Sequence, residues 1–156
     1  MDAEVWPDER VARLVTENFI PARVHVREQP DDYRRFGERY AAQWTPTILE
    51  LDPDGDERHR IEGFLPATDF LGQLSLGLAK MAFHRQEWKE AELGFQEVVD
   101  RYPESEAAPE ALYWAGVARY KDSGDGRALA ETAEAFAGRY EDTSWAKKAS
   151  VWAKPA

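Results

Sequence analysis

Two short runs of β-branched and apolar residues, separated by a turn, form the clearest pattern of hydrophobic and polar positions in the chain. The runs are Thr47–Leu51 and Arg58–Phe64, and the segment between them, Asp52–Asp56, contains an Asp-Gly pair. Asp-Gly between such runs is a strong signal for a β-hairpin. Pro46 stands directly ahead of the first run, where a residue without an N–H is tolerated. The pattern therefore predicts a hairpin, entered through a Thr-Pro step that suits a cis peptide bond.

Three further elements are predicted ahead of the hairpin. The segment Pro7-Asp8-Glu9 opens a helix, because apolar residues follow it at helical spacing. Residues 20–27 (Ile20–Arg27) alternate between apolar and polar side chains, which indicates a half-buried strand. Gln29 and Pro30 end this strand, and a second helix is expected after them. The apolar stripe of this second helix comprises Tyr33, Phe36, Tyr40 and Ala41.

Beyond the hairpin the chain has a helical character and repeats itself. A helix is predicted over Thr68–Leu78, and strand-forming residues become sparse after it. Residues 101–114 share Arg, Tyr, two Ala and Trp in register with residues 139–152, which lie 38 positions further on. Such a period indicates helix–turn–helix repeats. The second repeat would contain a helix at Arg127–Tyr140, and Ser144–Trp152 would cap the array. An ordinary antiparallel helical hairpin is the alternative.

The first half of the chain resembles part of a known family. The Trp44-Thr45-Pro46-Thr47 entry, the Gly63-Phe64 exit and the helix that follows are similar to the C-terminal half of a thioredoxin-like domain. Upstream, Val5–Val11 and Glu17–Val24 resemble the segment that runs from the redox helix into the second strand of that family. The resemblance covers roughly residues 1–80. The family's chemistry requires a Cys-x-x-Cys pair, and this sequence contains no cysteine.

The second half resembles tetratricopeptide repeats, which place small residues where two helices cross and an apolar plug between them. The matching positions of the first repeat are Ala79, Ala82, Ala91, Phe95, Val98 and Pro103. The second repeat keeps Leu112, Gly116 and Tyr120 but has a longer period. The expected fold class is therefore α/β followed by all-α. A truncated thioredoxin-like unit at residues 1–80 is followed by a tetratricopeptide-like array at 68–156, and the two share the helix at 68–83.

The resemblance also implies a gap in the sheet. In thioredoxin-like domains, the strand that leads into Cys-x-x-Cys lies between the strands assigned here to Ile20–Arg27 and Thr47–Leu51. Without it both strands would leave backbone groups unpaired, at about 1–3 kcal/mol for each buried group. We expect the two strands to pair directly in an antiparallel, three-stranded sheet. The alternatives are a strand from another molecule at the edge, or a poorly held segment from Met1 to Phe19.

Composition and charge narrow the classes of partner. The net charge of −10 argues against nucleic acid and anionic membranes, which reward clustered Lys and Arg. The absence of cysteine excludes disulfides and thiolate ligands within this sequence. No apolar run approaches the length of a membrane span. A cytoplasmic location is the default expectation.

No catalytic, cofactor-binding or metal-binding residues are predicted. The three carboxylates of Asp52–Asp56 resemble a calcium loop only superficially, because glycine and glutamate are missing from the required places. A hairpin turn is the better interpretation. His25, His59 and His84 lack the spacing of metal ligands and are interpreted as surface residues. No Ser-His-Asp order or phosphate-binding glycine loop is found.

Two groups of residues are candidates for binding. In thioredoxin-like proteins the residue before the cis-proline offers its backbone to an extended peptide, so the resemblance points to Trp44, Thr45 and Pro46. In tetratricopeptide arrays the inner face of the first helices forms a groove. The residues that the alignment places on this face include Lys80, Tyr113, Val117 and Lys121.

Two functions follow from these resemblances. The first is a redox-inactive module that binds a protein or peptide, and no cofactor is expected for it. The alternative is part of a thiol-disulfide oxidoreductase whose Cys-x-x-Cys lies upstream of Met1. Self-association through the exposed sheet edge is a further expectation.

Overall fold

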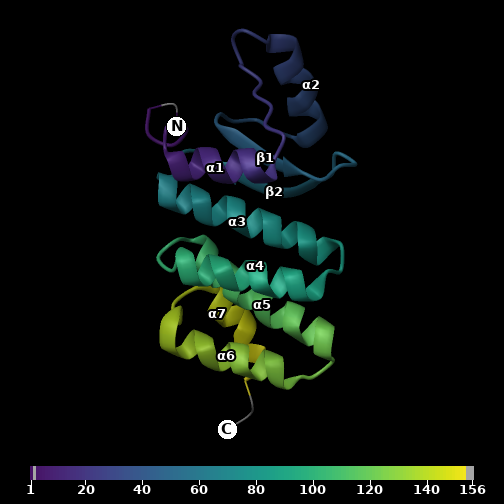
Figure 1. Ribbon diagram of the computed structural model, residues 1–156, viewed down its shortest axis with the longest axis vertical. Coiled ribbons are helices and arrows are strands. Elements are labelled where there is room, and N and C mark those ends of the chain that lie inside the picture. Colours follow the sequence, from purple (N-terminus) through teal and green to yellow (C-terminus); the bar gives the residue numbers. More distant parts are fainter. Residues whose placement is uncertain (2, 154–156) are drawn as a thin grey trace. The chain divides into compact units, whose positions relative to one another are not determined.

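The structure is a computed structural model that describes residues 1 and 3–153, so the end of the predicted array, residues 154–156, lies outside the described residues. The chain forms two compact units, and the boundary between them lies between residues 71 and 72, within helix α3 (Ala67–His84). The first unit contains α1 (Glu9–Asn18), α2 (Pro30–Tyr40), β1 (Thr47–Leu51) and β2 (Glu57–Glu62) (Figure 1). This order agrees with an incomplete thioredoxin-like unit followed by helices.

Helix α1 begins where the sequence predicts. The Asp8 carboxylate accepts a hydrogen bond from the Arg10 backbone N–H at 2.9 Å and so caps the helix. The Arg10 side chain also donates to this carboxylate, which lowers the pKa of Asp8 to about 2. Val5 and Val11 are fully buried, and the Trp6 ring packs edge-on against Phe70 at 5.4 Å between centroids. The segment before Phe19, which one alternative treated as poorly held, thus contributes buried residues to the core of the first unit.

The hairpin forms as predicted, with β2 one residue longer at its start and two residues shorter at its end. Its strands pair antiparallel, with Ile48 opposite Ile61 and a register shift after Glu50. In the turn, the Asp52 carboxylate accepts from the backbone N–H groups of residues 54 and 56 at 3.0 and 2.9 Å. Gly55 supplies a positive φ of 82°. Backbone donation from residue 56 is the main cause that lowers the pKa of Asp52.

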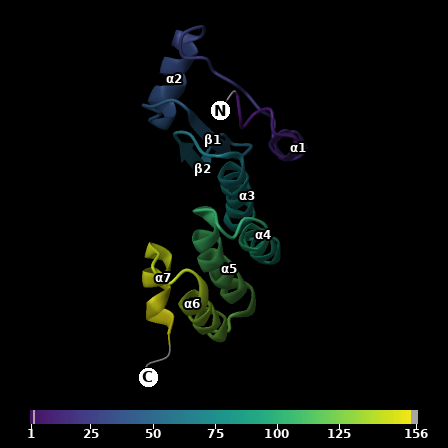
Figure 2. The ribbon, with the colours of Figure 1, turned by 90° about the vertical axis from the view of Figure 1, so that its left-hand side faces the viewer.

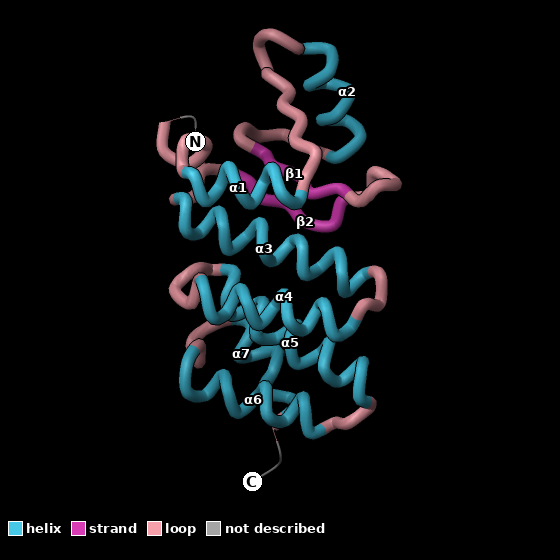
Figure 3. The backbone as a smooth tube through the Cα atoms, viewed as in Figure 1, coloured by secondary structure: helices cyan, strands magenta, loops and turns pink. Residues whose placement is uncertain are grey.

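The prediction of a strand at Ile20–Arg27 is wrong, and so is the prediction of a three-stranded sheet. Only β1 and β2 pair among the described residues, and the connection from α1 to α2 is a loop for most of its length (Figure 3). Ile20 is completely exposed. A turn competes with extension at the end of this segment, because Gln29 N–H donates to His25 C=O at 2.8 Å. Alternation of apolar and polar residues therefore did not suffice to make a strand where no neighbouring strand offers hydrogen bonds.

Hydrogen exchange can test how this loop compares with the helices of the second unit. The N–H groups of Ile20 and Val24 donate no backbone hydrogen bond in the described chain. We expect them to exchange about a hundredfold or more faster than buried helical amides such as that of Val98. Exchange measured by NMR or mass spectrometry at neutral pH would contradict this if both sets were equally protected.

The second unit is a stack of helices: α4 (Trp88–Arg101), α5 (Ala107–Ser123), α6 (Arg127–Arg139), α7 (Ser144–Ala149) and the short 3-10 helix η1 (Ser150–Trp152). Figure 2 shows α5 between α4 and α6, and its closest packing is against these two helices. The C-terminal part of α3 joins the same core through Leu76 and Ala79. The predicted plug residues of the first repeat are central here, because Ala91, Phe95 and Val98 are fully buried.

The 38-residue echo has a structural counterpart at two helix ends. Arg101 lies over the ring of Tyr102 at the end of α4, and Arg139 lies over Tyr140 at the end of α6. The Tyr140 hydroxyl then donates to the carbonyl of Pro103 at 2.8 Å, which links the two turns. The predicted helix at 127–140 is thus confirmed to within one residue, whereas the predicted cap helix at 144–152 ends in a 3-10 turn.

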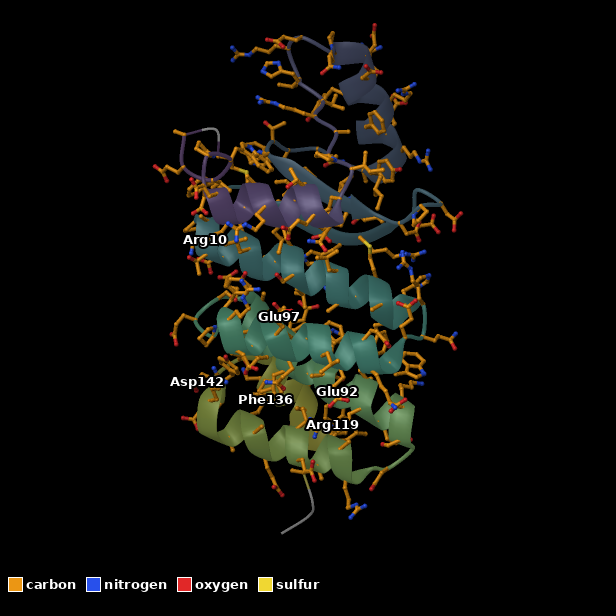
Figure 4. The ribbon with its side chains drawn as sticks, viewed as in Figure 1. Arg10, Glu92, Glu97, Arg119, Phe136 and Asp142 are labelled. Atoms are coloured by element: carbon orange, nitrogen blue, oxygen red, sulfur yellow. The ribbon has the colours of Figure 1, made fainter. Side chains whose placement is uncertain are left out.

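The ion pairs of one arginine, Arg119, link three of these helices. Arg119 on α5 contacts Glu92 on α4 at 2.7 Å and Glu131 on α6 at 3.2 Å. The Arg119 and Glu92 side chains lie on facing helices in Figure 4. Because Arg119 is partly exposed, each pair is worth little alone.

Candidate functional site

The segment that enters β1 presents a large apolar side chain to solvent. Trp44 is 68% exposed, and the Thr45–Pro46 peptide bond is cis. The segment is held at both ends, because the Thr47 hydroxyl donates to the Trp44 carbonyl at 2.8 Å and the Gly63 N–H donates to the Pro46 carbonyl at 2.8 Å. The exposed indole therefore projects from a backbone that is fixed by the hairpin.

The hydrogen-bond phase of the hairpin shows which backbone groups of β1 face away from β2. The Pro46 carbonyl accepts from β2's flank at Gly63, and the Asp52 N–H donates to the Asp56 carbonyl. Even-numbered residues of β1 therefore point toward β2, since antiparallel partners alternate along a strand. The N–H and C=O groups of Thr47, Leu49 and Leu51 point the other way. In the described part of the chain these three residues form no backbone hydrogen bond with another segment. We call this row the outer edge of β1.

Charged side chains cover the other edge of the hairpin. Arg60 on β2 contacts Glu57 at 2.6 Å and Glu62 at 3.0 Å, and these two carboxylates raise the pKa of Arg60. Arg58 pairs with the carboxylate of Asp56 at 3.2 Å. Alternating charges of this kind discourage the addition of another strand to β2.

Helix α2 is attached to the hairpin by polar contacts rather than by buried apolar residues. The Tyr40 hydroxyl donates to the Gly55 carbonyl at 2.9 Å, and the Arg60 guanidinium donates to the Tyr40 carbonyl. None of the predicted apolar stripe of α2 is fully buried, and Phe36 is 37% exposed. The helix therefore forms a polar support for the turn.

Two buried polar residues escaped the sequence interpretation. Glu50 on β1 and His59 on β2 lie directly opposite each other and are 3% and 8% exposed. The interpretation of His59 as a surface residue is wrong. Its position was readable in principle, because His59 is in the same alternation phase as the buried Ile61. His84 is exposed as expected.

The four candidate groove residues lie in the second unit and differ in their surroundings. The Lys80 ammonium contacts the Glu110 carboxylate at 2.6 Å, joining α3 to α5. The Tyr113 ring stacks on Trp152 at 4.5 Å and contacts Trp145 at 5.2 Å between centroids. Val117 is half-buried and Lys121 is exposed. The end of the chain that follows α6 thus covers the Tyr113 ring.

The described residues contain neither a cluster of metal ligands nor a membrane-spanning helix. Within residues 1 and 3–153, no group of three or more His, Asp or Glu side chains is arranged to hold a metal ion. Among the helices that the structure describes, none has the length and apolar character to cross a membrane.

Comparison with known proteins supports the first resemblance. Residues 1–77 match the model of a family described as a thioredoxin-like domain. The matched residues include the first unit, the cis Thr45–Pro46 bond and the beginning of α3. A search of curated proteins and a search of solved structures found no match. Residues 1–77 are therefore similar to a thioredoxin-like domain, and the helical second unit is compatible with the predicted repeats.

Proposed function

We propose that this chain is a redox-inactive, thioredoxin-like module that binds a protein or an extended peptide. The observation that carries the proposal is the position of Trp44, a 68% exposed indole that hydrogen bonds of the hairpin hold directly before β1. Exposed tryptophans in a fixed setting are frequent anchors of binding surfaces. The backbone of Thr45, the residue before the cis-proline Pro46, would contact the peptide, as the family resemblance implies.

The alternative function depends on a group that the sequence does not supply. Thiol-disulfide exchange requires a thiolate as nucleophile. The 156 residues contain no cysteine, and no other side chain can take over this role. The oxidoreductase alternative therefore applies only to a longer polypeptide that carries a Cys-x-x-Cys pair.

The tetratricopeptide-like groove is the second candidate binding site for a ligand. Its support is the repeated helical pattern and the exposure of Lys121. The ring of Tyr113, however, is already occupied by Trp145 and Trp152, and Lys80 is engaged by Glu110. A ligand in the groove would have to displace these contacts or add to them, so we favour the binding site at Trp44 over the groove.

A peptide selection distinguishes the two candidate binding sites. Peptides of random sequence displayed on phage would be selected on the whole chain, and the best synthetic peptide titrated against variants. We expect Trp44→Ala to weaken its binding about tenfold or more, because truncation removes an anchor. Leu93→Ala is the control, since Leu93 is 71% exposed in the second unit and lies outside both candidate binding sites.

The opposite result is equally informative. If Trp44→Ala bound the selected peptide as the unmodified chain does, while the double variant Lys80→Glu with Tyr113→Ala lost binding, the groove would be the site. Unchanged binding by both variants would show that neither candidate site binds the peptide. Failure to select any peptide would count against the proposed function.

A further inference from the structure

We propose that the ligand at Trp44 is a basic extended peptide, one of whose cationic side chains lies over the Trp44 indole beside the Glu62 carboxylate. This inference rests on the proposed function and adds the charge of the ligand to it. It starts from two accessible side chains, because Trp44 is 68% exposed and the Glu62 side chain is 52% exposed. The face of an aromatic ring attracts a cation, and tryptophan attracts it most strongly.

The hairpin brings the indole and the carboxylate to one of its ends. Thr47 stands directly opposite Glu62 in the antiparallel register, and side chains in such a pair point to the same face. The Thr47 hydroxyl donates to the Trp44 carbonyl at 2.8 Å. The Gly63 N–H, next to Glu62 in the chain, donates to the Pro46 carbonyl at 2.8 Å. Trp44 and Glu62 therefore belong to the same hydrogen-bonded end of the hairpin, where one peptide can contact both.

Arg60 does not neutralise this end of the hairpin. Its guanidinium contacts Glu62 at 3.0 Å and Glu57 at 2.6 Å, so one cation is shared between two carboxylates. The hydrogen bond from Arg60 lowers the pKa of Glu57, which therefore stays ionised at neutral pH. One net negative charge remains on these three side chains, and it favours a cationic ligand over an anionic one.

The rest of the first unit has the same sign of charge. Residues 1–71, which form this unit, contain 16 Asp and Glu residues against nine Arg and no Lys. The field of this excess attracts basic peptides from solution and speeds their association. An acidic peptide would be repelled by Glu62 locally and by the whole unit at longer range.

Three pools of synthetic peptides test the sign of the ligand's charge. Each pool contains random extended peptides with lysine as the basic residue and a fixed net charge of about +3, 0 or −3, and is passed over the immobilised whole chain. At about 50 mM salt we expect the basic pool to be retained about tenfold or more over the neutral pool. Most of this preference should disappear at about 500 mM salt, because salt screens exposed charges. Equal retention of the pools would overturn this inference alone, whereas retention of none would contradict the proposed function as well.

Glu62→Gln separates the local carboxylate from the overall charge. We expect this variant to bind the best basic peptide about threefold or more weakly, because it removes the charge beside the indole. Glu134→Gln is the control, since Glu134 is exposed on α6 in the second unit and its replacement changes the net charge by the same amount. Circular dichroism checks that both variants fold. Equal affinities of the two variants would show that only the overall charge acts, and would overturn the inference.

A double-mutant cycle tests the contact between the cation and the indole. Each lysine of the best peptide is replaced by norleucine, which keeps the aliphatic stem and removes the ammonium group. One such replacement should weaken binding to the unmodified chain about two- to fivefold and leave binding to Trp44→Leu unchanged. If every replacement had the same effect on both proteins, the indole would not contact the cation and the inference would be overturned. Full binding of the peptide by Trp44→Ala would instead contradict the proposed function.

Discussion

Replacing Phe95 with alanine is expected to lower the free energy of unfolding of the second unit by about 3–5 kcal/mol, the usual cost of removing a buried aromatic side chain. Phe95 is fully buried on α4 and belongs to the cluster that joins α3, α4 and α5. Its ring lies 6.2 Å from that of Phe83, between centroids. Urea unfolding followed by helical circular dichroism would measure the change.

Leu93→Ala provides a matched control on the same helix. Leu93 is 71% exposed, so its truncation removes few contacts and leaves helix propensity nearly unchanged. We expect a change within about 0.5 kcal/mol. If Phe95→Ala had an equally small effect, the packing of α3 and α5 around α4 would not hold the second unit together.

The place of Phe95 in this core was predictable from the sequence alone. It follows Ala91 by four residues and precedes Val98 by three, so the three side chains lie on one face of α4. The hairpin was predictable for a different reason, because Asp-Gly chemistry specifies its turn locally. In both cases the information lies within one helix or one pair of neighbouring strands.

The strand expected at Ile20–Arg27 shows where such reasoning ends. Its alternation is more regular than that of β1, yet a strand is defined by hydrogen bonds to a neighbour from any part of the sequence. β1 has its neighbour six residues away across the turn. The segment from Ile20 has none among the described residues, so it remains a loop.

The candidate binding site was predictable only in part. The family resemblance selected Trp44 and Pro46, but the sequence could not show that the indole is exposed, since tryptophan is as often buried. The outer edge of β1 was also out of reach. Its outward groups are identified by the hydrogen bonds of Pro46 and Asp52, and their phase follows from the register rather than from side-chain pattern.

Gly116 gives a further expected result, at the contact between α5 and α6. A Cβ atom placed on Gly116 would lie 2.7 Å from the Cβ of Thr132 and still closer to the Thr132 hydroxyl. Rotation of the threonine cannot relieve the first of these contacts, because Cβ moves only with the backbone. Thr132 is also buried, and its hydroxyl donates to the Ala128 carbonyl at 2.8 Å.

We therefore expect Gly116→Ala to force α5 and α6 apart and to destabilise the second unit by about 1–3 kcal/mol, although alanine favours helix more than glycine does. Gly138→Ala on α6 is the matched control, because nothing described lies within 4 Å of its added Cβ. This control should be neutral or stabilise the unit by up to about 1 kcal/mol. Urea unfolding of both variants makes the comparison, and a Gly116→Ala protein as stable as the Gly138→Ala protein would show that α5 and α6 do not approach each other this closely.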